Sequence, residues 1–461
     1  MKIAPLPTLL VVAALPAISL VARTEAPANR APLNFSVMTD RPLIDRSGGP
    51  QEVVVRVELT GHPRDRRARQ PMNLAIVLDR SGSMSGAKLE QARQAAEMLV
   101  DRLAPDDIFS LVTYDTEVTV LVPPQPIGQR ADAIRRQIRA IEPGGSTALY
   151  HGVEAGGRQL AEFFDEKRIN RVLLLSDGIA NVGPSSNQEI ARLGQSLARQ
   201  GRSVTTIGLG DDYNEDLMTA LAEASDANYY HVADVEALPD VFRRELGELE
   251  TVIARRLTID IEFPDGVEPL GILGRGETIA GNRTRIAFNT LAAEQRREVF
   301  IACRVDPTVW KEATTTLARA TLTCQAAEDD SDVRLTGEVA AKATDDRALA
   351  AKAQVADIAA QAEIYRNTDA TRLALAKADG GDRAAAQAMI GSQIKRLEAA
   401  AASAPAPAAA TLNAEADQLR QAESELGSSA GLSKEGRKQM QWNVFQRSNS
   451  KPVDRSASGT R

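Results

Sequence analysis

The residues best suited to chemistry are hydroxyl and carboxylate side chains that follow an apolar segment. The run Asp79-Arg80-Ser81-Gly82-Ser83 comes directly after the apolar residues 74–78. This order places one carboxylate and two hydroxyls where a buried strand ends. Mg²⁺ prefers oxygen ligands in near-octahedral geometry and keeps several waters, so the set suits a hard divalent cation. The chemistry that it indicates is cation binding and not bond cleavage.

Two further segments carry oxygen-bearing side chains in similar positions. Thr147 precedes a helical run over 148–162, and Asp177 follows the apolar run 171–176. The carboxyl ends of the strands in an open α/β sheet line one crevice, where ligands usually bind. The D-x-S-x-S spacing alone is equally compatible with Ser and Asp capping the next helix. With the two further segments, we expect a metal site formed by Asp79, Ser81, Ser83, Thr147 and Asp177.

The pattern over residues 72 to 246 resembles the von Willebrand factor type A (vWA) domain with a complete metal-ion-dependent adhesion site. Asp79, Ser81 and Ser83 match the first motif of that family, Thr147 its threonine and Asp177 its distal aspartate. The resemblance implies that the hydroxyls contact the metal and that the aspartates act directly or through water. It also implies that a partner protein supplies a carboxylate to the open coordination position. The sequences of residues 78–84 and 228–234 most resemble those of bacterial secreted members of the vWA family.

The expected function is metal-dependent protein–protein binding, in adhesion or assembly, through Mg²⁺ that accepts an Asp or Glu from the partner. Mn²⁺ and Ca²⁺ are alternative metals. The charges of Asp79 and Asp177 would roughly neutralise a dication and leave it short of ligands. One alternative is a vWA subunit of an ATPase-associated maturation system, and another is a metal-dependent hydrolase. We expect no enzyme, because the local sequence supplies no obvious His or Glu as a general base.

The net charge and the positions of the histidines and cysteines argue against several other functions. The formal net charge of −7 argues against broad nucleic-acid binding. His62, His151 and His231 show no ligand spacing, which argues against a zinc site. Cys303 and Cys324 lie on the apolar faces of alternating segments and could face one another across neighbouring strands. A disulfide and two buried free thiols are both compatible with this pattern.

Two acidic residues are expected on the same rim as the metal. Asp211 and Asp212 follow the apolar segment 204–208 and its two glycines. They could add negative potential there, and capping of the helix that starts near Asn214 would explain at least one of them.

The N-terminus predicts export. Met1-Lys2, the apolar run 3–21 and the small residues near 22–26 are typical of a secretory signal peptide over residues 1–26. An uncleaved N-terminal anchor is the alternative, because the run approaches the length that spans a bilayer. We therefore expect a periplasmic or secreted bacterial protein whose mature chain does not span the membrane.

The remaining sequence divides by periodicity. Alternating strand-like and helical segments over 72–247 predict an α/β domain with a doubly wound, mainly parallel sheet, and a short turn before Val118 predicts an antiparallel edge. A period of two over 250–340 predicts an antiparallel β-sandwich, which strands within 30–62 are expected to join. An Ala-rich helical region is expected over 345–427 and a largely disordered tail over 428–461, apart from the aromatic residues 442–445.

Overall fold

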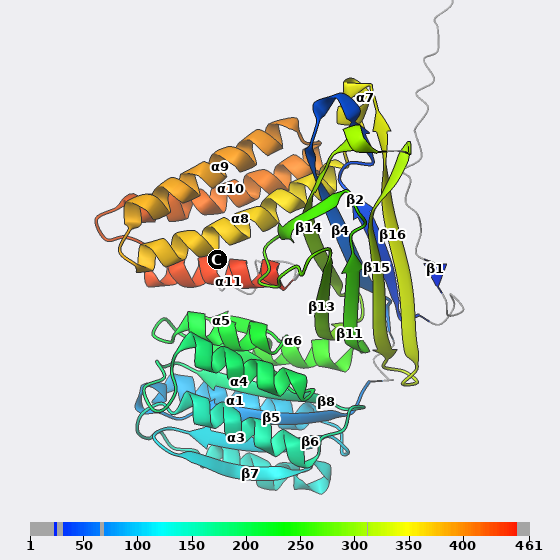
Figure 1. Cartoon of the computed structure of the whole chain (residues 1–461). Coiled ribbons are helices and arrows are strands. Elements are labelled where there is room, and N and C mark those ends of the chain that lie inside the picture. Colours follow the sequence, from blue (N-terminus) through cyan, green and yellow to red (C-terminus); the bar gives the residue numbers. More distant parts are fainter. Residues whose placement is uncertain (1–22, 25–30, 65–68, 311, 450–461) are drawn as a thin grey trace, which may run out of the picture.

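The computed structural model of this protein describes residues 23–24, 31–64, 69–310 and 312–449. It contains an α/β domain, two antiparallel sheets packed face to face, and a layer of C-terminal helices (Figure 1). The predicted fold class is therefore confirmed. The predicted signal peptide lies outside the described residues, apart from positions 23–24. Within the described part of the chain, no helix is long and apolar enough to cross a membrane.

The α/β domain is built on a six-stranded sheet in the order β10-β9-β8-β5-β6-β7. Its two central strands are buried along their whole length, because helices cover both faces. β7 pairs antiparallel with β6, as the short turn predicts, and the other neighbours pair in parallel. The strands are β5 (Met72–Asp79), β6 (Ile108–Tyr114), β7 (Val118–Pro126), β8 (Ile169–Ser176), β9 (Ser203–Leu209) and β10 (Tyr229–Val232).

Each face of this sheet has its own apolar core. One core is shared with α1 (Ala87–Arg102), α2 (Ala131–Arg139) and α6 (Leu238–Glu250). The other is shared with α3 (Leu149–Glu162), α4 (Asn187–Arg199) and α5 (Glu215–Ala224). The helices therefore hold the strand ends in fixed positions at the carboxyl rim of the sheet.

The two antiparallel sheets form a sandwich into which the α/β domain is inserted between β4 and β11. One sheet has the order β1-β16-β15-β11-β13 with β3 parallel to β16, and the other has the order β12-β14-β4-β2. Their facing side chains form one apolar core. The strands are β1 (Arg23–Thr24), β2 (Leu33–Thr39), β3 (Leu43–Asp45), β4 (Gln51–Gly61), β11 (Val252–Glu262), β12 (Val267–Ile272), β13 (Arg283–Ala292), β14 (Arg296–Val305), β15 (Thr314–Ala326) and β16 (Asp332–Thr344).

The two cysteines lie in different sheets of the sandwich. Cys303 is on β14 and Cys324 is on β15, and both are buried free thiols. The expectation that they face one another across neighbouring strands is wrong, because β14 pairs with β4 and β12 whereas β15 pairs with β11 and β16. Their apolar surroundings explain the alternating pattern without a disulfide.

The helical layer packs on the outer face of one sheet. The rings of Phe300 on β14 and Tyr365 on α8 lie 4.6 Å apart, and Val54 and Ile358 belong to the same apolar cluster. Three long helices share a second cluster of mainly Ala, Ile and Leu side chains. The helices are α7 (Arg347–Lys352), α8 (Ala356–Asp379), α9 (Arg383–Ser403), α10 (Ala406–Gly427) and α11 (Lys434–Ser448).

Helix α11 corrects the prediction of a largely disordered tail over 428–461. Residues 434–448 are helical, and Trp442 and Phe445 are buried in the core shared with α3, α4 and α5. The Phe445 ring meets the Tyr229 ring edge to face at 5.5 Å. The polar composition of this segment gave no indication that it is buried. Its basic residues are accommodated because they pair with carboxylates of the α/β domain. α11 thus lies between α8 and α5 (Figure 1).

Candidate metal centre

Adjacent parallel strands bring the two predicted aspartates to one rim. β5 and β8 are neighbours in register, with Leu78 opposite Leu175. Asp79 is the last residue of β5, and Asp177 directly follows the end of β8. Both carboxylates are fully buried. Their closeness follows from strand order, because parallel neighbours end at the same edge of the sheet.

Glycines hold the two hydroxyl-bearing loops together. The N–H of Gly82 donates to the carbonyl of Gly145 at 3.1 Å, and the N–H of Gly144 donates to the carbonyl of Arg80 at 2.6 Å. A Cβ atom at Gly144 would overlap the Asp115 carboxylate, and one at Gly145 would overlap the Thr116 hydroxyl. The close approach of these backbones therefore requires the Gly-Gly pair that precedes Thr147.

The predicted hydroxyls converge with the aspartates. Ser81 Oγ and Ser83 Oγ are 3.1 Å apart, and Ser83 Oγ donates to Asp177 Oδ1 at 2.7 Å. Thr147 Oγ1 and Ser83 Oγ both border Gly178, where an added Cβ would lie 3.2 Å and 3.5 Å from them. The backbone N–H of Thr147 donates to Asn181 Oδ1 at 2.9 Å, which fixes the position of the threonine. The structure thus brings all five predicted residues together, and their role as metal ligands stays a prediction.

The Asp79 carboxylate is held by two donors. Its Oδ1 accepts the backbone N–H of Ser81 at 2.8 Å, and its Oδ2 accepts the hydroxyl of Ser176 at 2.7 Å. Burial raises the pKa of Asp79, although these hydrogen bonds act in the opposite direction. An ionised Asp79 is therefore a costly group in the absence of a nearby cation.

Two residues of the centre were not predicted. Ser176 anchors Asp79, and Lys88 Nζ lies 2.5 Å from Asp177 Oδ2. Lys88 is in the first turn of α1, where the helix dipole disfavours a cation. Because a cation in the first turn of a helix is unfavourable, Lys88, five residues after Ser83, was a sequence signal that a nearby carboxylate would pair with it.

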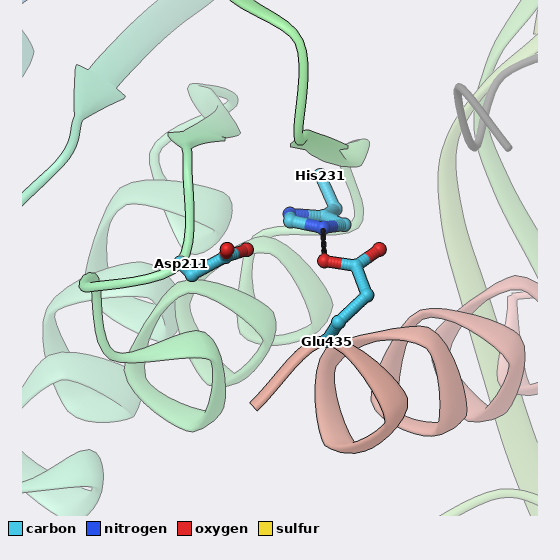
Figure 2. A group of neighbouring side chains, drawn as sticks. All are labelled: Asp211, His231 and Glu435. Atoms are coloured by element: carbon cyan, nitrogen blue, oxygen red, sulfur yellow. Dashed lines mark hydrogen bonds and ion pairs between the residues drawn. The ribbon is translucent and has the colours of Figure 1, made fainter. Parts of the chain in front are cut away.

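The acidic pair after β9 does not cap α5. Asn214 is the N-cap residue, and its side chain accepts the N–H of Leu217 at 3.1 Å. The expectation that Asp211 or Asp212 performs this role is wrong. Asp212 instead forms an ion pair with Lys434 of α11 at 2.8 Å, and Asp211 lies beside His231 and Glu435 (Figure 2).

Comparison with known proteins identifies the α/β domain. Residues 73–244 match the family model of the von Willebrand factor type A domain. An uncharacterized protein of Synechocystis is 28% identical over 220 residues, which cover 48% of this chain and 51% of that protein. The uncharacterized protein YfbK of Escherichia coli is 27% identical over 215 residues, which cover 46% of this chain and 37% of that protein. The chain thus spans about half or less of these curated relatives.

A solved structure agrees over most of the chain. The protein described as von Willebrand factor type A from Catenulispora acidiphila has a TM-score of 0.68 and 18% identity, with 90% of this chain and 96% of that chain covered. At this identity the likeness shows the fold alone. The family match and the strand order agree with the vWA resemblance of the sequence. Residues 73–244 of this chain therefore form a vWA domain, a kind of domain that commonly mediates protein–protein interaction.

Proposed function

We propose that this chain binds a partner protein through a divalent cation held by Asp79, Ser81, Ser83, Thr147 and Asp177, with Mg²⁺ as the expected metal. The observation that carries the proposal is the 3.1 Å separation of Ser81 Oγ and Ser83 Oγ beside the two aspartates. Adjacent ligands in an octahedral Mg²⁺ shell are about 3.0 Å apart, because each lies roughly 2.1 Å from the metal. The two hydroxyls therefore fit neighbouring positions of such a shell.

The chain's own residues divide the work of this site. Asp79 and Asp177 supply negative charge from buried positions, and Ser176 and the Ser81 N–H hold Asp79 in place. Ser83 is exposed, so the centre opens to solvent on that side. When bound, the cation supplies an open coordination position that an Asp or Glu of the partner can occupy. The proposal thus places the contact surface around Ser83 on the rim of the sheet.

We propose binding without catalysis. Within the described residues, the hydrogen bonds and ion pairs of the five side chains involve no histidine and no glutamate that could act as a general base. We further propose that the protein acts in the periplasm or outside the cell, on the strength of the N-terminal sequence.

The test combines metal binding with partner capture. Mg²⁺ titration by calorimetry should give binding for the wild type and none for Asp79→Asn. Asp212→Asn is the matched control, since Asp212 lies on the same rim but pairs with Lys434. A bacterial envelope fraction is then passed over each variant in Mg²⁺ and in EDTA. A protein retained only by the wild type and Asp212→Asn in Mg²⁺ supports the proposal, and equal retention in all conditions refutes it.

A further inference from the structure

A second cluster of ligand-type side chains joins helix α11 to the vWA domain. Asp211 follows β9, His231 lies in β10, and Glu435 lies in the first turn of α11. One ligand atom from each of the three residues lies within 4.8 Å of the other two. Figure 2 shows the three side chains pointing toward one another from these separate elements. Residues from distant parts of the chain therefore converge on one point.

A hydrogen bond orients the imidazole of His231 toward the place where the three side chains meet. The ring is buried, and its Nδ1 lies 2.8 Å from the hydroxyl of Tyr213, which in turn contacts the hydroxyl of Tyr229 at 2.7 Å. Nε2 is thereby directed toward Glu435. A hydrogen-bond partner on the second ring nitrogen is the usual companion of a metal-binding histidine, because it fixes the ring and its tautomer.

The spacing fits a coordination shell better than a hydrogen bond. His231 Nε2 and Glu435 Oε2 are 3.4 Å apart. This distance exceeds the roughly 2.7–3.2 Å of a good hydrogen bond from nitrogen to oxygen. Two ligands that each lie about 2.1 Å from a tetrahedral zinc ion are roughly 3.4 Å apart. The pair therefore has the separation of two ligands of one ion.

We propose that Asp211, His231 and Glu435 bind a first-row divalent cation of the zinc type, which fastens α11 to the vWA domain. One imidazole and two carboxylates suit such an ion, whereas the all-oxygen centre at Asp79 suits Mg²⁺. The two carboxylates balance the charge of the dication. This site is independent of the proposed function, since none of its residues belongs to the Asp79 centre.

The test uses the full chain, stripped of metal and held in excess Mg²⁺ to fill the Asp79 centre. Zn²⁺ is titrated by calorimetry, and Co²⁺ is added separately to record its visible absorption. The wild type and Asp79→Asn should each take up one Zn²⁺ and show the absorption of a tetrahedral Co²⁺ site. Glu435→Gln and Asp211→Asn should bind Zn²⁺ at least about tenfold more weakly. Asp212→Asn, the neighbouring acidic residue, should bind as the wild type does.

A second readout locates the ion. Zn²⁺ should slow amide hydrogen exchange in residues 434–448 of the wild type and should leave the exchange of Glu435→Gln unchanged. Glu435 is partly exposed, so its replacement by Gln should leave the fold intact. Equal Zn²⁺ affinity in the wild type, Glu435→Gln and Asp211→Asn would overturn the proposal. Absence of Zn²⁺ uptake by the wild type in Mg²⁺ would overturn it too, and the cluster would then be an ion pair only.

Discussion

The Nζ atom of Lys88 lies 2.5 Å from Oδ2 of Asp177, so an ammonium group neutralises one of the two carboxylates of the candidate metal centre. Asp177 is fully buried, whereas about a quarter (27%) of the Lys88 side chain is exposed. The lysine therefore has room to move toward solvent, and the aspartate does not. A dication at this centre would meet the positive charge of Lys88 beside Asp177, one of its candidate ligands.

Replacement of Lys88 by Met should strengthen Mg²⁺ binding and weaken the metal-free fold. We expect affinity to rise by roughly tenfold, which corresponds to about 1.4 kcal/mol of removed charge repulsion. Without metal and without Lys88, the described contacts of the Asp177 carboxylate are reduced to the Ser83 hydrogen bond, and stability should fall by about 1–3 kcal/mol. Calorimetry and denaturation in EDTA measure the two effects. Lys434→Met is the control, and weaker Mg²⁺ binding by Lys88→Met would contradict this account.

Replacement of Asp79 by Asn should abolish Mg²⁺ binding without destabilising the metal-free protein. The raised pKa of Asp79, caused by burial, means that its ionised form costs folding free energy. This cost is absent below the ordinary pKa of an aspartate, grows as the pH rises above it, and is complete once the pH exceeds the raised pKa. In EDTA, the melting temperature of the wild type should therefore fall relative to that of Asp79→Asn as the pH rises above about 4, the ordinary pKa of an aspartate. A variant that melts below the wild type at neutral pH would show that the carboxylate itself stabilises the fold.

The buried ion pair between Lys438 of α11 and Glu215 of α5 should contribute more to folding stability than the exposed pair between Lys434 and Asp212. Lys438 is 2% exposed, and its Nζ lies 2.6 Å from Glu215 Oε2 and 2.9 Å from the carbonyl of Tyr213. Lys438→Met should cost the lower end of the roughly 3–5 kcal/mol typical of one partner lost from a buried pair, since Arg437 still contacts Glu215. Lys434→Met removes an exposed pair and should cost under about 1 kcal/mol. Urea denaturation distinguishes the two, and similar losses would mean that Lys438 contributes no more than a surface contact.

Low pH should weaken the contact between α11 and α5. Burial raises the pKa of Glu215, but the contacts with Lys438 and Arg437 outweigh it and leave the pKa below its ordinary value. A carboxyl with a depressed pKa in the folded state stabilises the protein above its unfolded pKa, and this contribution is lost as the pH falls through the folded pKa. The protection of amides 434–448 against hydrogen exchange, taken relative to the intrinsic rate at each pH, should therefore decrease below about pH 4 in the wild type. In Lys438→Met this acid dependence should be smaller.

The two cysteines should be unreactive in the folded protein. Burial raises the pKa of both Cys303 and Cys324 to about 12. At about pH 8 only roughly one thiol in ten thousand is then ionised, and the thiolate is the reactive form. A thiol reagent should label neither residue in the native state, and both after denaturation without a reductant. Labelling that appears only after reduction would reveal a disulfide and contradict the two free thiols of the structure.

The sequence predicted the vWA domain well because its determinants are local. Each candidate ligand follows an apolar strand, and parallel strands end at one rim, so Asp79 and Asp177 could be placed together without coordinates. The role of Lys88 was not predicted, because its partner Asp177 is 89 positions away in the sequence. The same limit applies to Glu435, which meets His231 across 204 positions. Periodicity detects which face of an element is buried, but it does not identify the partner that covers that face.

Helix α11 shows the other limit. Its charged composition is typical of a solvated tail, yet Trp442 and Phe445 are buried. Arg437 compensates for the polarity by contacting Glu215, Asp216 and Asp379 at once. Multiple ion pairs of this kind arise only after the helix has docked, so composition alone could not indicate them.

The insertion of the vWA domain between β4 and β11 has a mechanical consequence. An inserted domain held only by its two chain crossings could swing about them as a hinge. Here α11 adds a third attachment at the β10 edge of the sheet, where Phe445 packs on Tyr229, and Asn289 of β13 contacts the neighbouring strand β9 through Ser203 Oγ at 2.8 Å. A partner that pulls on the rim near Ser83 would therefore load the sandwich and the helical layer together, so that tension is shared by the whole molecule.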